Sequence, residues 1–198
     1  MSQSYYDISD ILAEEERVPV SFSTPAHDLG YLVEGSQDVD VDVNTKIDLP
    51  YWLAERLASK QYVTFETPNF YLVKHRNGIL ADPSNADLRQ CCTVFYQLGM
   101  RVAPWLGATS QERSELEIDL VKVLTQRFHS ILDHSQNSHN EDNTKFTNIL
   151  DATELDLYWE GYAAAGDYVK WKHSRTQKLE HSWLIELHER RRKRRRLK

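Results

Sequence analysis

Short runs of alternating or helically spaced apolar residues fill the first 66 positions of the chain. Residues 7–16 place three aliphatic side chains at helical spacing among acidic ones, which predicts a short helix. Residues 18–22 alternate as a strand does, and Pro19 favours an edge strand because proline has no N–H to donate. An acidic loop is preferred to a strand for residues 34–46, because rows of Asp would repel on one face. The same patterns predict strands at 29–33 and 62–65, and a helix opened by Asp48-Leu49-Pro50 that ends at Ser59-Lys60.

From residue 67 onward the spacing of apolar residues is almost entirely helical. The clearest helix begins near Thr109 and Glu112, which have capping-box spacing, and apolar residues then recur every three or four positions. Ile118 and Val121 widen its apolar stripe, so burial on more than one side is expected. The other predicted helices are 68–80, one from Asp82-Pro83 to Val102, and one from Asn143 that Gly161 and Gly166 break or bend.

These patterns predict an α+β protein, a mainly α-helical bundle domain preceded by a small β-rich N-terminal domain. Its 198 residues, 40% hydrophobic and 11% aromatic, suffice for a folded core without metals or disulfides. The two cysteines are adjacent, which favours a reducing compartment, cytosol or nucleus. Neither a secretory signal pattern nor a run of eighteen apolar residues occurs, so no membrane span is expected. The expected parts are a small β-rich domain at 1–66, a helical domain at 67–189 and a basic tail at 190–198.

Charge is distributed very unevenly along the chain. The net charge is −6, yet residues 190–198 hold eight of the 24 Lys and Arg, which leaves the body near −14. Such a body repels DNA phosphate, whereas the tail attracts it. The tail suits nuclear import, DNA contact or simple solvation, and import is the commonest use of a short basic cluster. The nuclear-import candidate consists of Arg190, Arg191, Arg192, Lys193, Arg194, Arg195 and Arg196.

Candidate catalytic groups are few. His129, His134 and His139 share a polar region with carboxylates, but a spacing of five turns side chains about 140° apart on a helix, which suits a metal poorly. Cys91 and Cys92 sit in an apolar helical stretch, where buried structural thiols are expected. The chain has no phosphate-loop, dinucleotide, nucleophile-elbow or zinc-protease motif. We therefore expect no enzyme activity, no catalytic or metal residues and no cofactor.

Several motifs, in one collinear order from about Tyr5 to Trp171, resemble subunits of the GINS DNA replication complex, and most closely the subunit 3 family. The helix start Leu49-Pro50-Tyr51-Trp52-Leu53-Ala54 is similar to that family's Leu-Pro and Trp-Leu-Ala pattern. The other similar segments are Asp7-Ile8-Ser9-Asp10-Ile11-Leu12 with Val18-Pro19-Val20, Asp82-Pro83, Phe95-Tyr96, and Ser135-Gln136-Asn137-Ser138-His139-Asn140-Glu141-Asp142. The acidic Val-Asp loop, the stretch after Trp171 and the very basic end depart from the family pattern.

The resemblance implies a non-catalytic subunit whose small β-rich domain precedes its helical domain, as in subunits 2 and 3. It implies a nuclear heterotetramer with the three other GINS subunits. It further implies association with the MCM hexamer and a RecJ-like Cdc protein in the active replicative helicase, the CMG complex, and an indirect link to DNA polymerase epsilon. Whether the chain touches DNA is left open.

Three hypotheses follow for function. The first is an obligate interaction subunit that exposes apolar helical surface when isolated, with Phe128, Ile131, Trp159 and Tyr162 as the expected partner interface. The alternative is a nucleic-acid-binding protein that acts through its basic C-terminal tail. An enzyme built on the histidine cluster ranks last, since no residue pattern suggests a reaction.

Overall fold

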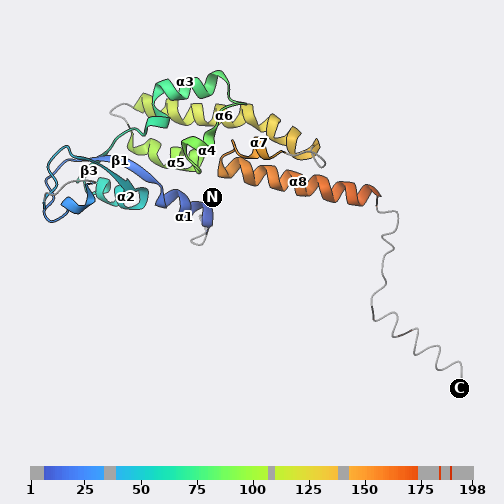
Figure 1. The fold of residues 1–198 in the computed structure, drawn as a ribbon, viewed down its shortest axis with the longest axis horizontal. Coiled ribbons are helices and arrows are strands. Elements are labelled where there is room, and N and C mark those ends of the chain that lie inside the picture. The colour runs from blue at the N-terminus through green and yellow to red at the C-terminus, as the bar shows by residue number, and fades with distance from the viewer. Residues whose placement is uncertain are drawn as a thin grey trace, which may run out of the picture. The chain divides into compact units, whose positions relative to one another are not determined.

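The chain folds as the α+β protein that the sequence predicts, with a small sheet followed by helices (Figure 1). The computed structural model describes residues 7–33, 39–106, 110–137, 143–173, 183 and 188. Its internal contacts define two compact units, residues 1–162 and 163–198, and each is described by itself. No helix in the described ranges is long and apolar enough to cross a membrane.

The sheet has three antiparallel strands in the order β2-β1-β3, with bounds β1 Arg17–Phe22, β2 Lys46–Pro50 and β3 Val63–Phe65. The edge position predicted from Pro19 is wrong, because β1 is the central strand. Pro19 lies where the short ladder with β3 ends, and its carbonyl accepts a bond from the Glu66 N–H at 3.0 Å. An N–H at this position would also point toward β3. Its absence in proline therefore removes only the last hydrogen bond of the β1–β3 ladder.

Alternation along β1 decides which face of the sheet is buried. Val18, Val20 and Phe22 are all at most 3% exposed, and they share the core with residues of β2 and β3. The helices α1 (Ile8–Glu15) and α2 (Tyr51–Ser59) pack against each other beside the strands. Phe65 of β3 stacks on Trp105 with ring centroids 5.5 Å apart, which joins the sheet to the 3-10 turn η3 (Ala103–Trp105) of the helical part.

Two further predictions for the first 66 residues need correction. The strand expected at 29–33 is a 3-10 turn, η1 (Gly30–Leu32), because Asp28 has a φ of 60° and turns the chain just before it. The helix expected to open at Asp48 begins only at Tyr51, since residues 46–50 pair with β1 as β2. The loop prediction for 34–46 holds for its described residues up to β2, where Val41 makes an isolated bridge to Ala26.

The single helix predicted from Asp82 to Val102 is instead two helices, α4 (Leu88–Cys91) and α5 (Phe95–Val102), followed by η3 (Ala103–Trp105). Asp82 ends α3 (Val73–Ala81) and accepts a bond from Asn85, so it begins no helix. Asp87 caps α4 instead, through the Gln90 N–H at 2.9 Å. Extended backbone at Cys92 then separates the two helices. The predicted helix 68–80 is likewise η2 (Asn69–Tyr71) followed by α3.

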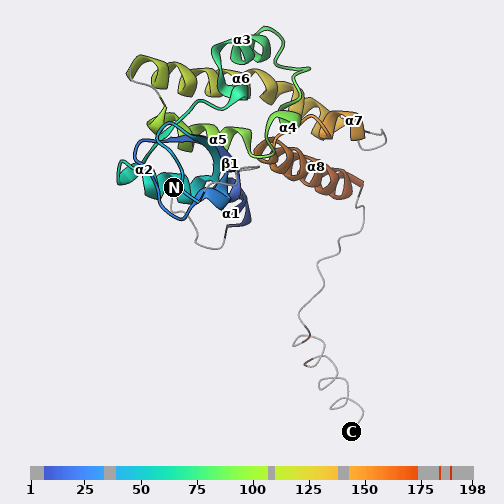
Figure 2. The ribbon, with the colours of Figure 1, turned by 60° about the vertical axis from the view of Figure 1, so that its left-hand side comes forward.

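The long helix α6 (Ser110–Asn137) runs alongside α3 and α5, as both Figure 1 and Figure 2 show. After α7 (Thr144–Thr147), helix α8 (Ala152–His173) continues unbroken, so of the break or bend predicted at its two glycines the break does not occur. A Cβ on Gly161 would lie 2.5 Å from the Ser135 hydroxyl, so this glycine permits close packing of α8 on α6. Thr109, expected near the start of α6, lies outside the described residues.

The buried residues of the first unit form two clusters. The larger runs from Ala13 through the strands, α2 and α5 to Val123 of α6. The smaller consists of Ile131, Leu150 and Tyr158, where α6, α8 and the turn between α7 and α8 meet. The strands therefore share the larger cluster with α2, α5 and α6, and the domain boundary at residue 66 stays a prediction.

Candidate partner interface

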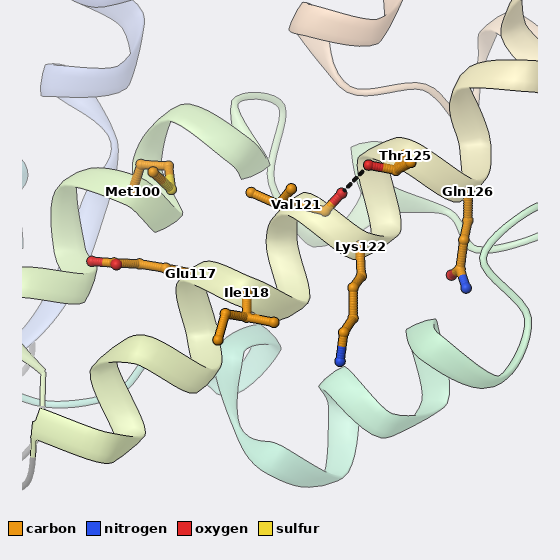
Figure 3. A pocket seen from close by; sticks show the side chains of 7 residues that line it. All are labelled: Met100, Glu117, Ile118, Val121, Lys122, Thr125 and Gln126. Atoms are coloured by element: carbon orange, nitrogen blue, oxygen red, sulfur yellow. Dashed lines mark hydrogen bonds between the residues drawn. The ribbon is translucent and has the colours of Figure 1, made fainter.

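An open apolar groove of about 510 Å³ lies on α6 and the neighbouring α5 (Figure 3). Its apolar centre is Ile118 and Val121 of α6 with Met100 of α5, which are 52%, 56% and 49% exposed. The side chains of the rim are Glu117, Lys122, Thr125 and Gln126. We call this surface the α6 groove. Its lining can bind apolar side chains of a partner, and a flexible methionine lets it adapt to their shape.

The α6 groove exists because α6 carries apolar residues on two of its sides. Leu116, Leu120 and Val123 recur every three or four positions and are buried against the core. Ile118 and Val121 repeat at the same interval on a different side of the helix. The burial predicted for this second side is not found among the described residues, where Ile118 and Val121 stay exposed. A second apolar side without an internal neighbour is typical of a subunit surface.

A second exposed apolar surface, the α8 aromatic cluster, consists of Tyr158, Trp159 and Tyr162. The ring centroids of Trp159 and Tyr162 are 5.8 Å apart and edge-on, and those of Tyr158 and Tyr162 are 6.3 Å apart. Trp159 is 54% exposed, Tyr162 is half-buried and Tyr158 is buried. Rigid aromatic groups of this kind bury much area on binding and lose little side-chain entropy.

The four residues predicted for the interface are placed differently from one another. Phe128 of α6 is 38% exposed, and its ring packs edge-on against His129. Trp159 and Tyr162 lie together in the α8 aromatic cluster. Ile131, in contrast, is 1% exposed and packs in the smaller buried cluster, so the expectation that it offers surface is wrong. Its side chain belongs to the inward-facing apolar stripe of α6 and packs with Leu150 and Tyr158.

A buried polar network holds α8 against α6 and fixes the position of the α8 aromatic cluster. The Arg127 guanidinium donates to both carboxylate oxygens of Glu154, at 2.7 and 3.0 Å, and Tyr96 donates to the same carboxylate at 2.8 Å. The remaining guanidinium hydrogens reach the backbone carbonyls of Pro83, Ala86 and Ile149. Arg127 and Glu154 are 2% and 0% exposed, so the pair is fully desolvated and its hydrogen bonds are needed. Sequence reasoning missed this network, although Arg127 interrupts an otherwise apolar α6 stripe.

Asp151 directly precedes α8 and lies beside this network. Its carboxylate accepts from the Phe95 N–H at 2.6 Å and from the Thr153 N–H at 3.0 Å. Burial raises the pKa of Asp151 to about 6, against the backbone hydrogen bonds, which lower it. Asp151 therefore couples α5 to α8 and makes that contact sensitive to pH.

The residues considered for catalysis are held in structural roles. Burial raises the pKa of Cys92 to about 12 and also raises that of Cys91, so neither thiol is activated. The rings of His134 and Phe146 stack with their centroids 4.0 Å apart, and His134 Nδ1 hydrogen-bonds to the Ser130 carbonyl. Within the described ranges no three His, Cys, Asp or Glu side chains gather as a metal site, and His139 lies outside those ranges. The basic segment Arg190–Arg196 also lies outside them.

Comparisons with known proteins agree on one family. Residues 6–59 match the family model described as the PSF3 N-terminal domain. The "Probable DNA replication complex GINS protein PSF3" of Dictyostelium discoideum is 33% identical over 177 residues, which cover 89% of this chain and 64% of that protein. The "DNA replication complex GINS protein PSF3" of Mus musculus is 30% identical over 96% of this chain and 89% of its own length. The corresponding Aspergillus fumigatus protein is 31% identical, covering 85% of this chain and 96% of that relative.

Proposed function

This chain belongs to the PSF3 family of DNA replication complex GINS proteins, and we propose that it acts as an architectural subunit of the four-chain GINS assembly within the replicative helicase. The family is non-catalytic, so the role of the chain lies in the surfaces that it presents. The observation that carries the proposal is the α6 groove, an apolar surface on a helix packed firmly on the core. The α8 aromatic cluster supplies a second such surface.

The proposed partners are the three other GINS subunits, and through them the MCM hexamer and a RecJ-like Cdc protein; DNA polymerase epsilon is an indirect one. The mechanism is conformational, because a subunit without ATPase chemistry contributes by stabilising one arrangement of its partners. A firm α6–α8 framework serves this purpose, since the buried Arg127–Glu154 pair joins the two helices. A replication subunit works in the nucleus. The division into a small domain at 1–66 and a helical domain at 67–189 is part of the same proposal.

Co-purification tests this proposal. The chain is produced alone and together with the three other GINS subunits, and the masses of the native particles are measured. An equimolar four-chain complex, with poor behaviour of the isolated chain, is the expected result, because exposed apolar surface promotes self-association. A well-behaved monomer that ignores the three subunits would contradict the proposal.

A pair of variants locates the contact. Ile118→Ser with Val121→Ser removes the apolar centre of the α6 groove and should weaken incorporation into the complex by at least about tenfold, as truncation of central interface residues does. The matched control is Leu72→Ser with Val73→Ser, which removes similar side chains that are 43% and 58% exposed before and at the start of α3. Equal incorporation of the two variants would remove the α6 groove from the interface.

The basic tail supports the alternative function, direct nucleic-acid binding. Residues 190–198 carry eight positive charges against an acidic body. If the tail binds phosphate, its deletion should remove DNA affinity, and binding by the full chain should weaken steeply with salt, by about 0.9 in log–log slope per phosphate contact. Unchanged DNA affinity after deletion would exclude this alternative. The same deletion tests nuclear import, which is measured as the location of the shortened chain in cells.

A further inference from the structure

We propose that the outer face of α1, formed by Ile8, Ile11 and Leu12, docks into an apolar groove flanked by Lys or Arg side chains on another protein of the helicase assembly. We call these three residues the α1 face. The proposal rests on the proposed function, because it requires that the chain works inside a larger assembly. It concerns an element separate from the α6 groove and the α8 aromatic cluster.

The α1 face is exposed to a degree that is unusual for three neighbouring aliphatic residues. Ile8 is 73% exposed, Ile11 is 47% exposed and Leu12 is 54% exposed. Positions i, i+3 and i+4 lie on one side of a helix, so the three side chains form one continuous strip. A helix that only covered its own core would turn this strip inward.

Ion pairs hold α1 with its apolar strip outward. Arg101 of α5 donates to Asp10 at 2.7 Å and to Glu14 at 3.1 Å, and its side chain is only 16% exposed. Ala13, on the same side of α1 as Asp10, is fully buried. The acidic side of the helix therefore faces the body, and its small residue allows close contact with α2 and α5. Because the polar side is used internally, the outward position of the α1 face is fixed by the fold.

The charges around the α1 face indicate the chemistry of its partner. Glu15 continues the strip one turn beyond Leu12, and Asp7 lies along one flank, and both are exposed. No Lys or Arg occurs within α1. Nucleic acid and anionic lipid would be repelled by such a surface. A protein groove with an apolar floor and a basic rim is complementary to it, in the manner of a helix docked in a groove.

Size indicates that this partner is held by other contacts as well. Three aliphatic side chains and one carboxylate supply far less than the roughly 800 Å² per partner of an independent stable interface. The α1 face therefore adds to an interface inside an assembly, where the effective concentration of the partner is already high. Because the α1 face is too small to bind alone, its partner is expected among the proteins of the helicase.

Thiol labelling tests the proposal. Ile11→Cys introduces a thiol on the α1 face, and Leu72→Cys introduces a matched thiol at a position that is 43% exposed. The two native thiols add little background, because burial raises the pKa of both. Maleimide labelling rates are measured for the chain alone, for the four-subunit GINS complex, and for that complex bound to the MCM hexamer and the RecJ-like protein. Labelling at position 11 should slow by at least about tenfold in an assembled state, since a covered thiol reacts only when the interface opens.

Two results would overturn the proposal. One is an unchanged rate at position 11 in every assembled state, and the other is equal slowing at positions 11 and 72, which is general shielding. Native mass measurement of the same samples separates this failure from that of the proposed function. Absence of any four-chain complex removes both proposals, whereas a formed complex with unprotected Ile11→Cys removes only the role of the α1 face.

A charge variant tests the basic rim. Glu15→Lys in the Ile11→Cys background should restore most of the labelling rate, because it places like charges against each other, and Glu15→Asp should keep the protection. Protection that persists unchanged with Glu15→Lys would exclude a basic rim. Asp10 and Glu14 are left intact throughout, so the ion pairs that orient α1 are kept.

Discussion

The sheet region and the α6–α8 region distribute polar and apolar groups in opposite ways. In the sheet region Val18, Val20 and Leu49 lie inside, and a charged pair, Lys46 with Glu66 at 2.6 Å, lies on the surface. This is the arrangement of a self-sufficient fold, whose stability comes from removing apolar area from water.

The α6–α8 region places a charged pair inside and apolar residues outside. Arg127 and Glu154 are buried, whereas Val121 and Trp159 are more than half exposed. The apolar residues that a self-sufficient fold would bury are here exposed, and ionic and hydrogen-bonding contacts hold the helices instead. In this region, therefore, the residues that hold the helices together differ from those exposed on the surface.

The largest effect is expected from breaking the buried pair. Glu154→Ala leaves the Arg127 charge buried without a partner, which should lower the free energy of unfolding by about 3–5 kcal/mol. Denaturant unfolding of the isolated chain measures this loss. The double variant Arg127→Met with Glu154→Leu should regain most of the stability, because it removes both charges together. As a surface control, Lys46→Ala should cost less than about 1 kcal/mol. A loss of similar size at the two sites would contradict the contrast between the regions.

Next in size is truncation of the sheet core. Leu49→Ala removes a side chain that is 2% exposed and should cost about 3 kcal/mol, the transfer free energy of the lost atoms plus that of the cavity. Leu72→Ala, at an exposed position, should change the unfolding free energy by less than about 0.5 kcal/mol. Denaturant unfolding measures the free energy of both variants. Near-equal losses in Leu49→Ala and Leu72→Ala would show that the sheet core does not dominate the stability of its region.

Asp151 adds a pH dependence to the stability of the α6–α8 region. Its pKa is 3.8 when free and about 6 when folded, so its stabilising contribution is complete below pH 3.8 and is lost as the pH rises through 6. From this group alone the chain should be more stable at pH 5 than at pH 7.5 by about 1 kcal/mol. Unfolding at the two pH values tests it, with Asp151→Asn as the control that should lose this part of the difference. An unchanged pH dependence in Asp151→Asn would refute the assignment.

The smallest effect on stability is expected at the α6 groove. Val121→Ser alters a side chain that is 56% exposed, so the unfolding free energy of the isolated chain should change by less than about 0.5 kcal/mol. Incorporation into the four-chain complex should nevertheless fall. If instead the isolated chain loses several kcal/mol, the outer side of α6 belongs to its own core, and the contrast between the regions disappears.

Local patterns predicted most of the elements but not their neighbours. The alternation of residues 18–22 indicated β1, yet Pro19 suggested an edge, because sequence alone does not show that β3 is only three residues long. The glycines of α8 suggested a break, although Gly161 serves close packing against Ser135, a residue distant in sequence. In both places a tertiary neighbour decided the outcome.

The candidate surfaces were predicted only in part for the same reason. Trp159 and Tyr162 of α8 were expected at the surface, and they are 54% exposed and half-buried. The second apolar side of α6 was read as buried, since periodicity shows that a side is apolar and not what covers it. Arg127 and Glu154 were missed because their partnership joins positions 27 residues apart on different helices.

The stack of Phe65 on Trp105 gives the protein a useful optical property. Of its five tryptophans, Trp105 packs against Phe65 of the sheet, while Trp52, Trp159, Trp171 and Trp183 are exposed. The fluorescence of the free chain is then dominated by indoles in water, with emission at long wavelengths. Covering Trp159 in a complex shifts emission to shorter wavelengths, whereas loss of the sheet exposes Trp105 and shifts it the other way. The direction of the shift in this chain's tryptophan emission therefore distinguishes docking from unfolding without any added label.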